Sequence, residues 1–200
     1  MKDWKNTKQS VAVTLGTTSG KMTTENREQM DYYATDPKAV RLLLELEKFE
    51  GKIWEAACGE GSLSEEMKRL GYEVFSTDII NRGYGDKFMD FLWFDNSEPI
   101  DMNIITNPPY RYANQFIIRA MSIIQEGKKL ALFLPIRYLE GIERKEIFRQ
   151  YPPKMVYVSS SRLKCALNGE FEKINSSALG FAWFVWQKGY DGETILRWFN

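Results

Sequence analysis

The chain has 200 residues, 44% of them hydrophobic, which is enough for one domain with a real core and too few for two large domains. Lysine plus arginine and aspartate plus glutamate both number 27, so any contact with nucleic acid must depend on a local patch of charge. There is no histidine, and Cys58 and Cys165 lack metal-binding spacing, which excludes a zinc site, a Ser-His-Asp triad and a histidine base. Without a long apolar run or a cleavable signal at the start, we expect a cytoplasmic protein.

Residues 1–30 are polar and show little hydrophobic periodicity, so we expect a flexible N-terminal arm or a partner-docking tail. The composition changes at Asp31, and we expect residues 31–200 to form a single domain. Its first helix is predicted over residues 39–49, with Asp36 or Thr35 as N-cap and a proline in the first turn.

A first strand, predicted over residues 51–57, runs into a loop that carries Gly59 and Gly61. Glycines between a strand and a helix let the backbone approach a ligand closely, and a helix is expected over residues 63–70. An ordinary strand-to-helix turn can have the same composition, so the loop alone does not specify a ligand.

A second strand, over residues 72–77, ends in Asp78, 23 residues after Glu55. An acidic side chain at about this spacing binds ribose hydroxyls in doubly wound nucleotide-binding sheets. The loop lacks the third glycine of a dinucleotide fingerprint and the Gly-Lys-Ser/Thr of a phosphate loop, and Glu55 would repel a pyrophosphate. This acidic loop favours a ligand with a positive centre and an amino group, as in S-adenosylmethionine.

A buried strand over residues 101–106 ends in Asn107-Pro108-Pro109-Tyr110. The two prolines remove backbone donors and fix φ, so a stiff platform forms at the strand's carboxyl end, where ligands bind in open α/β sheets. Amide and carbonyl oxygens can accept hydrogen bonds from the exocyclic NH2 of a planar group, and the Tyr110 ring can stack on that planar group. Such acceptors favour a tetrahedral nitrogen whose lone pair can attack. The alternative interpretation of this segment is structural: a strand that ends in a Pro-Pro turn with a surface tyrosine.

The rest of the chain alternates helices and strands, which indicates a mostly parallel α/β sheet flanked by helices. A helix that carries Phe116 is expected to end at Gly127. We also predict strands over residues 130–134, 155–159 and 178–187, and a helix over residues 138–150.

Three further segments have both a functional and a structural interpretation. Asp90 and Phe91 can lie beside a purine, or they are a surface acid and a core ring. The polar segment over residues 160–177 carries Arg162 and Lys164, which can contact phosphates or remain solvated. Phe181 and Trp183 share one face of the last predicted strand, where they pack in the core or form a wall of a base pocket.

Together these motifs, in this order, resemble those of adenine DNA methyltransferases that methylate the amino group, and especially compact members carried by phages and prophages. The resemblance covers residues 31 to 190, and the motifs that carry it are Tyr33-Ala34-Thr35-Asp36-Pro37, Glu55-Ala56-Ala57-Cys58-Gly59-Glu60-Gly61, Asp78, Asp90-Phe91, Asn107-Pro108-Pro109-Tyr110 and Phe181-Ala182-Trp183. It implies a Rossmann-like class I fold, with a mostly parallel sheet of seven strands whose last strand is antiparallel. It also implies a protein in the cytoplasm of a bacterium or a phage-infected cell.

The resemblance also implies roles for individual residues. S-adenosylmethionine would be bound by Tyr33, Thr35, Glu55, Ala56, Cys58, Gly59, Gly61, Asp78, Ile79, Asp90 and Phe91. Asn107 and the Pro108 carbonyl would hold the target amine, Pro109 would complete the turn, and Tyr110 would stack on the flipped base. DNA would also meet Arg162, Lys164, Phe181 and Trp183. The chain departs from its relatives in having Ala56-Ala57 where many carry a proline, and it shows no separate recognition domain.

The expected reaction is direct methyl transfer to the amino group of adenine in DNA, without a metal. Asn107 is neutral and is no base, so the proton leaves to water after transfer. Cytosine C5 methylation needs a cysteine nucleophile in a pocket, typically next to a proline. Cys58 lies in the predicted cofactor loop and Cys165 in a polar loop, which argues against that reaction. Adenine in RNA, a glutamine amide in protein, or cofactor binding by a subunit without turnover are the alternatives. The sequence does not indicate an oligomeric state.

Overall fold

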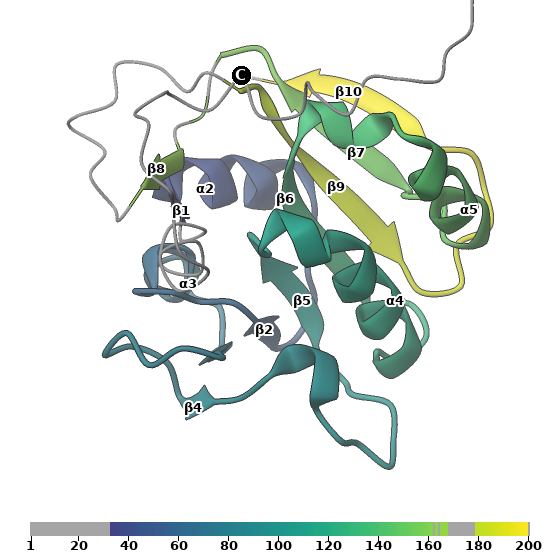
Figure 1. The fold of residues 1–200 in the computed structure, drawn as a ribbon. Coiled ribbons are helices and arrows are strands. Elements are labelled where there is room, and N and C mark those ends of the chain that lie inside the picture. The colour runs from purple at the N-terminus through teal and green to yellow at the C-terminus, as the bar shows by residue number, and fades with distance from the viewer. Residues whose placement is uncertain (1–32, 162, 164, 168–178, 200) are drawn as a thin grey trace, which may run out of the picture. The chain divides into compact units, whose positions relative to one another are not determined.

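The computed structural model describes residues 33–161, 163, 165–167 and 179–199, so the prediction of an N-terminal arm lies outside the described residues. In chain order the elements are β1 (Tyr33–Thr35), α2 (Pro37–Leu46), β2 (Ile53–Glu55), α3 (Ser62–Arg69), β3 (Val74–Asp78), β4 (Lys87–Phe88), the 3-10 turn η1 (Phe91–Trp93), β5 (Asn103–Thr106), η2 (Tyr110–Tyr112), α4 (Ala113–Ile123), β6 (Lys129–Pro135), η3 (Ile136–Leu139), α5 (Ile142–Gln150), β7 (Met155–Ser159), β8 (Cys165–Leu167), β9 (Phe181–Gln187) and β10 (Ile195–Phe199). Figure 1 shows how they are arranged.

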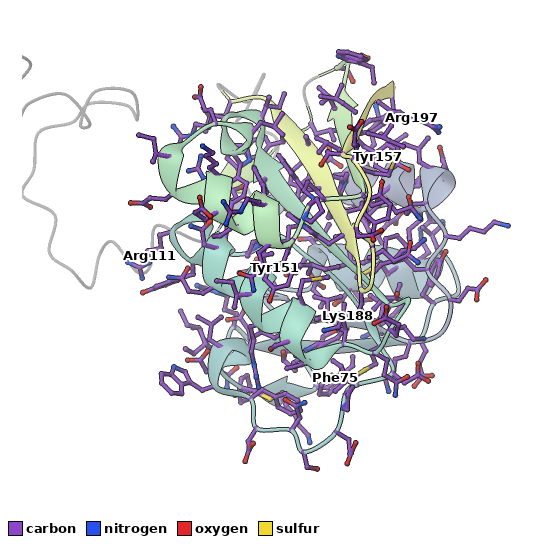
Figure 2. All side chains as sticks on the ribbon, turned by 90° about the vertical axis from the view of Figure 1, so that its right-hand side faces the viewer. Phe75, Arg111, Tyr151, Tyr157, Lys188 and Arg197 are labelled. Atoms are coloured by element: carbon purple, nitrogen blue, oxygen red, sulfur yellow. The ribbon has the colours of Figure 1, made fainter. Side chains whose placement is uncertain are left out.

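The main sheet has the strand order β10-β7-β9-β6-β5-β2-β3-β4. Within the described residues β9 is the strand that runs antiparallel to its neighbours, β6 and β7. The predicted, mostly parallel Rossmann-like sheet is confirmed, with two corrections. In the part of the chain that the structure describes it has eight strands rather than seven, and the last strand, β10, pairs in parallel with β7, while the antiparallel strand lies inside the sheet. Tyr157 and Arg197 face each other across the β7–β10 pair (Figure 2).

Helices cover both faces of this sheet because its strands are apolar on both sides. One core cluster joins α2 and α3 to the sheet, through Val40, Leu43 and Met67, and contains the odd-numbered β9 residues Phe181 and Trp183. The other joins α4 to the opposite face and contains the even-numbered β9 residues Ala182, Phe184 and Trp186. The period-two alternation of side chains in a strand explains this division.

Most predicted elements are present with shifted ends. Asp36 is the N-cap of α2, and its side chain accepts from the Lys38 amide at 2.9 Å. The helix after the double proline ends before Gly127, because Ile124 is already extended and bridges Ile100. The helix predicted over residues 138–150 is divided into η3 and α5.

Candidate active site

The carboxyl ends of three neighbouring strands bring the predicted motifs to one edge of the sheet. β2 pairs in parallel with β3 on one side and with β5 on the other. The chain continues outward from β2 through β3 to β4, and then returns to build β5 and β6 on the opposite side (Figure 1). The strand order therefore reverses between β2 and β5, which is where open α/β sheets bind ligands.

The glycine loop after β2 is fastened to the end of β3. The Gly59 amide donates to Asp78 Oδ2 at 2.8 Å, and the Ile80 amide donates to Asp78 Oδ1 at 2.9 Å. Gly59 and Gly61 have φ angles of 56° and 87°, in the left-handed region that favours glycine. Each Asp78 oxygen keeps a second lone pair, so the carboxylate can still accept hydrogen bonds from ribose hydroxyls.

A tyrosine that the sequence did not suggest as a site residue lies over this loop. A Cβ atom at Gly61 would stand 2.5 Å from the Tyr84 ring, so the missing side chain leaves room for that ring. The Tyr84 hydroxyl donates to Glu65 at 2.6 Å and accepts from Lys68 at 2.9 Å, both on α3. Glycines on either side of Tyr84 in the sequence are the only signal that marks it.

Glu55, at the end of β2, is 2% exposed. The Ser64 hydroxyl hydrogen-bonds to its carboxyl group and lies 2.6 Å from the Ser76 hydroxyl. Burial raises the pKa of Glu55 from its ordinary 4.5 to about 8, against the opposing effect of the bonds to Ser64. Glu55 is therefore mostly protonated near pH 7, and a cation beside it would favour the charged form.

The double-proline turn after β5 presents its polar groups at the same edge. Pro108 is buried, and among the described residues no group donates to its carbonyl oxygen. The Tyr112 amide donates to the Pro109 carbonyl at 2.8 Å, which closes the turn into η2. Asn107 and Tyr110 are partly buried, and the Asn107 Oδ1 atom is itself buried.

The β1–β8 ribbon packs against this turn. Asn107 Nδ2 donates to Thr35 Oγ1 at 2.9 Å, and the Tyr110 hydroxyl lies 3.9 Å from Cys165 Sγ. Tyr33 contributes its backbone to the ribbon, where it pairs with Leu167. The sequence did not reveal this ribbon, because its two strands are short and separated by more than a hundred residues.

Several predicted cofactor residues lie near these strand ends with different exposures. Ala56 and Cys58 are 3% and 4% exposed, whereas Ile79 is 65% exposed. The Asp90 side chain accepts from the Leu92 amide at 2.9 Å and caps η1. Phe91 is 2% exposed and packs edge-on against Trp54, with ring centroids 5.1 Å apart. The Phe91 ring therefore packs in the core. Of the two interpretations of this residue, a ring beside a purine or a core ring, the structure supports the second.

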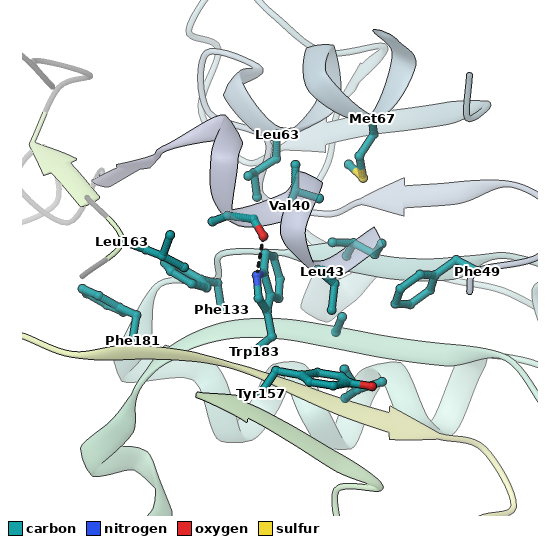
Figure 3. Close-up of a cluster of buried hydrophobic side chains, with 14 of the residues drawn as sticks. Val40, Leu43, Phe49, Leu63, Met67, Phe133, Tyr157, Leu163, Phe181 and Trp183 are labelled. Atoms are coloured by element: carbon teal, nitrogen blue, oxygen red, sulfur yellow. Dashed lines mark hydrogen bonds between the residues drawn. The ribbon is translucent and has the colours of Figure 1, made fainter. Parts of the chain in front are cut away.

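The structure corrects the expectation that Trp183 contacts the substrate. Trp183 is fully buried, and its indole N–H donates to the Ala39 carbonyl at 2.9 Å (Figure 3). Phe181 is 5% exposed, and its ring centroid lies 6.0 Å from that of Tyr110, so it supports the tyrosine from the core. Arg162 and Lys164 lie outside the described residues.

No protein-family model matches the chain, and no curated protein matches its sequence. Solved structures do match its fold. A Pyrococcus horikoshii protein assigned as an RNA methyltransferase superposes with a TM-score of 0.58 at 15% identity, over 80% of this chain and 88% of its own. The modification subunit assigned to a type I restriction enzyme of Vibrio vulnificus gives 0.55 at 14% identity, over 88% of this chain and 50% of its own.

A Listeria monocytogenes protein assigned as a class I S-adenosylmethionine-dependent methyltransferase gives a TM-score of 0.54 at 13% identity, over 81% of this chain and 62% of its own. The fold is that of the class I methyltransferases. At such low identities the likeness concerns the fold alone, and the chain spans only about half to two thirds of the Vibrio and Listeria proteins.

Neither a membrane span nor a metal cluster appears in the described part of the chain. No helix there is long and apolar enough to cross a membrane. No group of three or more histidine, cysteine, aspartate or glutamate residues is placed there to hold a metal ion.

Proposed function

We propose that the protein transfers a methyl group from S-adenosylmethionine to the exocyclic amino group of adenine in DNA. The observation that carries the proposal is the adjacency of β5, β2 and β3, which brings the Asn107 turn, the glycine loop and Asp78 to one sheet edge. A ligand at this edge would meet backbone donors, a carboxylate and an uncharged amide within one site. This combination suits a nucleoside that carries a cationic sulfonium group.

The residues after β2 and β3 fit this cofactor. Asp78 would accept from the ribose hydroxyls while it holds the Gly59 amide in place. The buried Glu55 would lose its proton beside a cation, because an adjacent positive charge favours the carboxylate. Asp90, at the start of η1, would lie toward the adenine ring of the cofactor.

The residues after β5 would align the target amine. The cofactor supplies an activated methyl group, so the protein provides orientation and hydrogen-bond acceptors rather than a strong base. The Asn107 carbonyl oxygen and the Pro108 carbonyl would each accept one amino hydrogen, which favours a tetrahedral nitrogen with its lone pair free to attack. Tyr110, backed by Phe181, would stack on the base. The nitrogen then loses one proton to water.

DNA is the proposed substrate because the sequence motifs resemble adenine DNA methyltransferases and because the fold matches a protein assigned as a restriction-system modification subunit. The adenine would have to leave the duplex stack, at a cost of a few kcal/mol. Arg111, which follows the turn, stacks on the Tyr112 ring with its guanidinium carbon 4.7 Å from the ring centroid. In Figure 2 Arg111 projects from the edge of the molecule, where it can meet a phosphate.

The test supplies tritiated S-adenosylmethionine together with separate pools of duplex DNA, single-stranded DNA, RNA and protein. The proposal predicts label in DNA, recovered as N6-methyl-2′-deoxyadenosine after digestion to nucleosides. Label in RNA or in a glutamine amide would replace DNA with that substrate. Cofactor binding by calorimetry without label in any pool would indicate a subunit that does not turn over.

A further inference from the structure

The Asn107 side chain is hydrogen-bonded to Thr35, which lies 72 positions earlier in the chain. Thr35 is 2% exposed, and its Oγ1 accepts a hydrogen bond from Asn107 Nδ2 at 2.9 Å. β1 and β8 pair antiparallel with Thr35 opposite Cys165, so the ribbon places both residues next to the double-proline turn, where Thr35 contacts Asn107 and Cys165 contacts Tyr110. Thr35 is therefore fixed by backbone pairing and not only by its own side chain.

Cys165 is a second hydrogen-bond partner of the Thr35 hydroxyl. The thiol is 7% exposed, the Thr35 hydroxyl hydrogen-bonds to it, and the Tyr110 hydroxyl lies 3.9 Å from its sulfur. A threonine hydroxyl has one proton. If that proton points to Cys165, the Thr35 oxygen can only accept, and the Asn107 NH2 group must be the end that faces it.

The orientation of this amide matters for the proposed reaction. An asparagine side chain has a carbonyl oxygen at one end and an NH2 group at the other, and the two are nearly isosteric. With the NH2 group bonded to Thr35, the carbonyl oxygen lies at the other end of the amide and is the group that could accept from an amine. In the flipped amide, two N–H donors would meet the donors of the target amino group, and the alignment for attack would be lost.

We propose that Thr35 is a positioning residue that fixes the orientation of the Asn107 amide, so that its carbonyl oxygen faces the target amine. This inference rests on the proposed function for its catalytic consequence. Thr35 is already expected to border the cofactor. The proposal gives it a second task, which is to orient Asn107 toward the methyl acceptor. A Cys165 sulfur that accepts the Thr35 proton would favour this orientation.

The test compares Thr35→Val, which removes the acceptor at nearly constant shape, with Thr35→Ser, which retains it. Thr106→Val is the matched control, because Thr106 is buried one residue before Asn107 and its hydroxyl makes no hydrogen bond within the described residues. We expect Thr35→Val to lower kcat about tenfold, as for an interaction that acts on the transition state. Thr35→Ser should recover most of the rate, and Thr106→Val should match the parent.

A second measurement keeps this inference separate from the proposed function. Hydrogen exchange of the Asn107 side-chain NH2 group, followed by NMR in the full chain, should be slow in the parent and in Thr35→Ser and faster in Thr35→Val. Equal exchange rates in all three would overturn the inference, as would a parental kcat in Thr35→Val while Asn107→Ala is inactive. If the parent itself labels no acceptor, the proposed function fails, and the exchange rates alone decide the role of Thr35.

Discussion

Asp78 accepts a hydrogen bond from the Gly59 amide at 2.8 Å, which links the end of β3 to the loop that follows β2. The two residues are 19 positions apart, Asp78 at the end of β3 and Gly59 in the loop that follows the parallel neighbour β2. One carboxylate therefore shapes the glycine loop and remains available to a ligand. The site can be organised before any cofactor binds.

Replacement of Asp78 should affect both stability and binding. Asp78→Ala removes two hydrogen bonds to backbone amides, so we expect the free energy of unfolding to fall by about 1–3 kcal/mol. The Kd for S-adenosylmethionine should rise at least about tenfold, since a hydrogen bond to a charged group is worth about 1.5–3 kcal/mol. Urea unfolding and calorimetry measure the two effects.

Asp86→Ala is the control for that experiment, because Asp86 also accepts from a backbone amide, that of Ser76, at 2.7 Å, but is exposed. It should lose stability without losing cofactor affinity. Parental affinity in Asp78→Ala would remove the ribose assignment.

Gly61→Ala should disturb the glycine loop more than backbone strain alone explains. At φ 87° an alanine is strained by about 1–2 kcal/mol, and its Cβ would also meet the Tyr84 ring. Gly71→Ala isolates the strain, because Gly71 has φ 90° and nothing within 4 Å of the added atom. We expect Gly61→Ala to lose more unfolding free energy than Gly71→Ala, and to weaken cofactor binding where Gly71→Ala does not. Equal losses of stability and affinity would show that Tyr84 does not press on the loop.

The raised pKa of Glu55 predicts a pH dependence of stability. Between its ordinary pKa of 4.5 and about 8, the folded chain holds a proton that the unfolded chain has lost. The carboxyl group therefore lowers stability as pH rises through this window, by at most about 1.4 kcal/mol per pH unit. Glu55→Gln does not titrate, so its advantage over the parent should be larger at pH 8 than at pH 5 in urea unfolding. A difference that does not change with pH would contradict the assignment.

Trp183→Phe should reduce stability and leave the chemistry intact. The indole N–H to Ala39 bond is lost, which costs about 1–3 kcal/mol because the carbonyl stays buried. Trp186→Phe is a matched control on the other face of β9, where the indole donates to the Tyr151 carbonyl at 3.0 Å. Both variants should keep the parental kcat and cofactor Kd. A kcat that falls only in Trp183→Phe would restore a direct role for this ring.

The sequence predicted the parts of the site that follow from strand ends. Apolar strands followed by Asn107, by the Gly59 loop and by Asp78 predict a parallel sheet with these groups at one edge, and the structure confirms the sheet that brings them together. Local patterns do not specify pairing between distant short segments, so the β1–β8 ribbon and its contact with Asn107 were missed. The alternation of side chains along β9 predicted correctly that Phe181 and Trp183 share one face of the strand. Alternation cannot distinguish a ring that packs in the core from a ring that lines a pocket.

The central claim is that Asn107 aligns an adenine amine for methyl transfer, and the most direct measurement is the single-turnover rate of tritium transfer to duplex DNA by the parent and by Asn107→Ala. We expect the parent to label the N6 position of adenine. We expect Asn107→Ala to be at least about a hundredfold slower, which corresponds to about 3 kcal/mol, while it binds S-adenosylmethionine with the parental Kd. Equal transfer rates for the two proteins would contradict the claim.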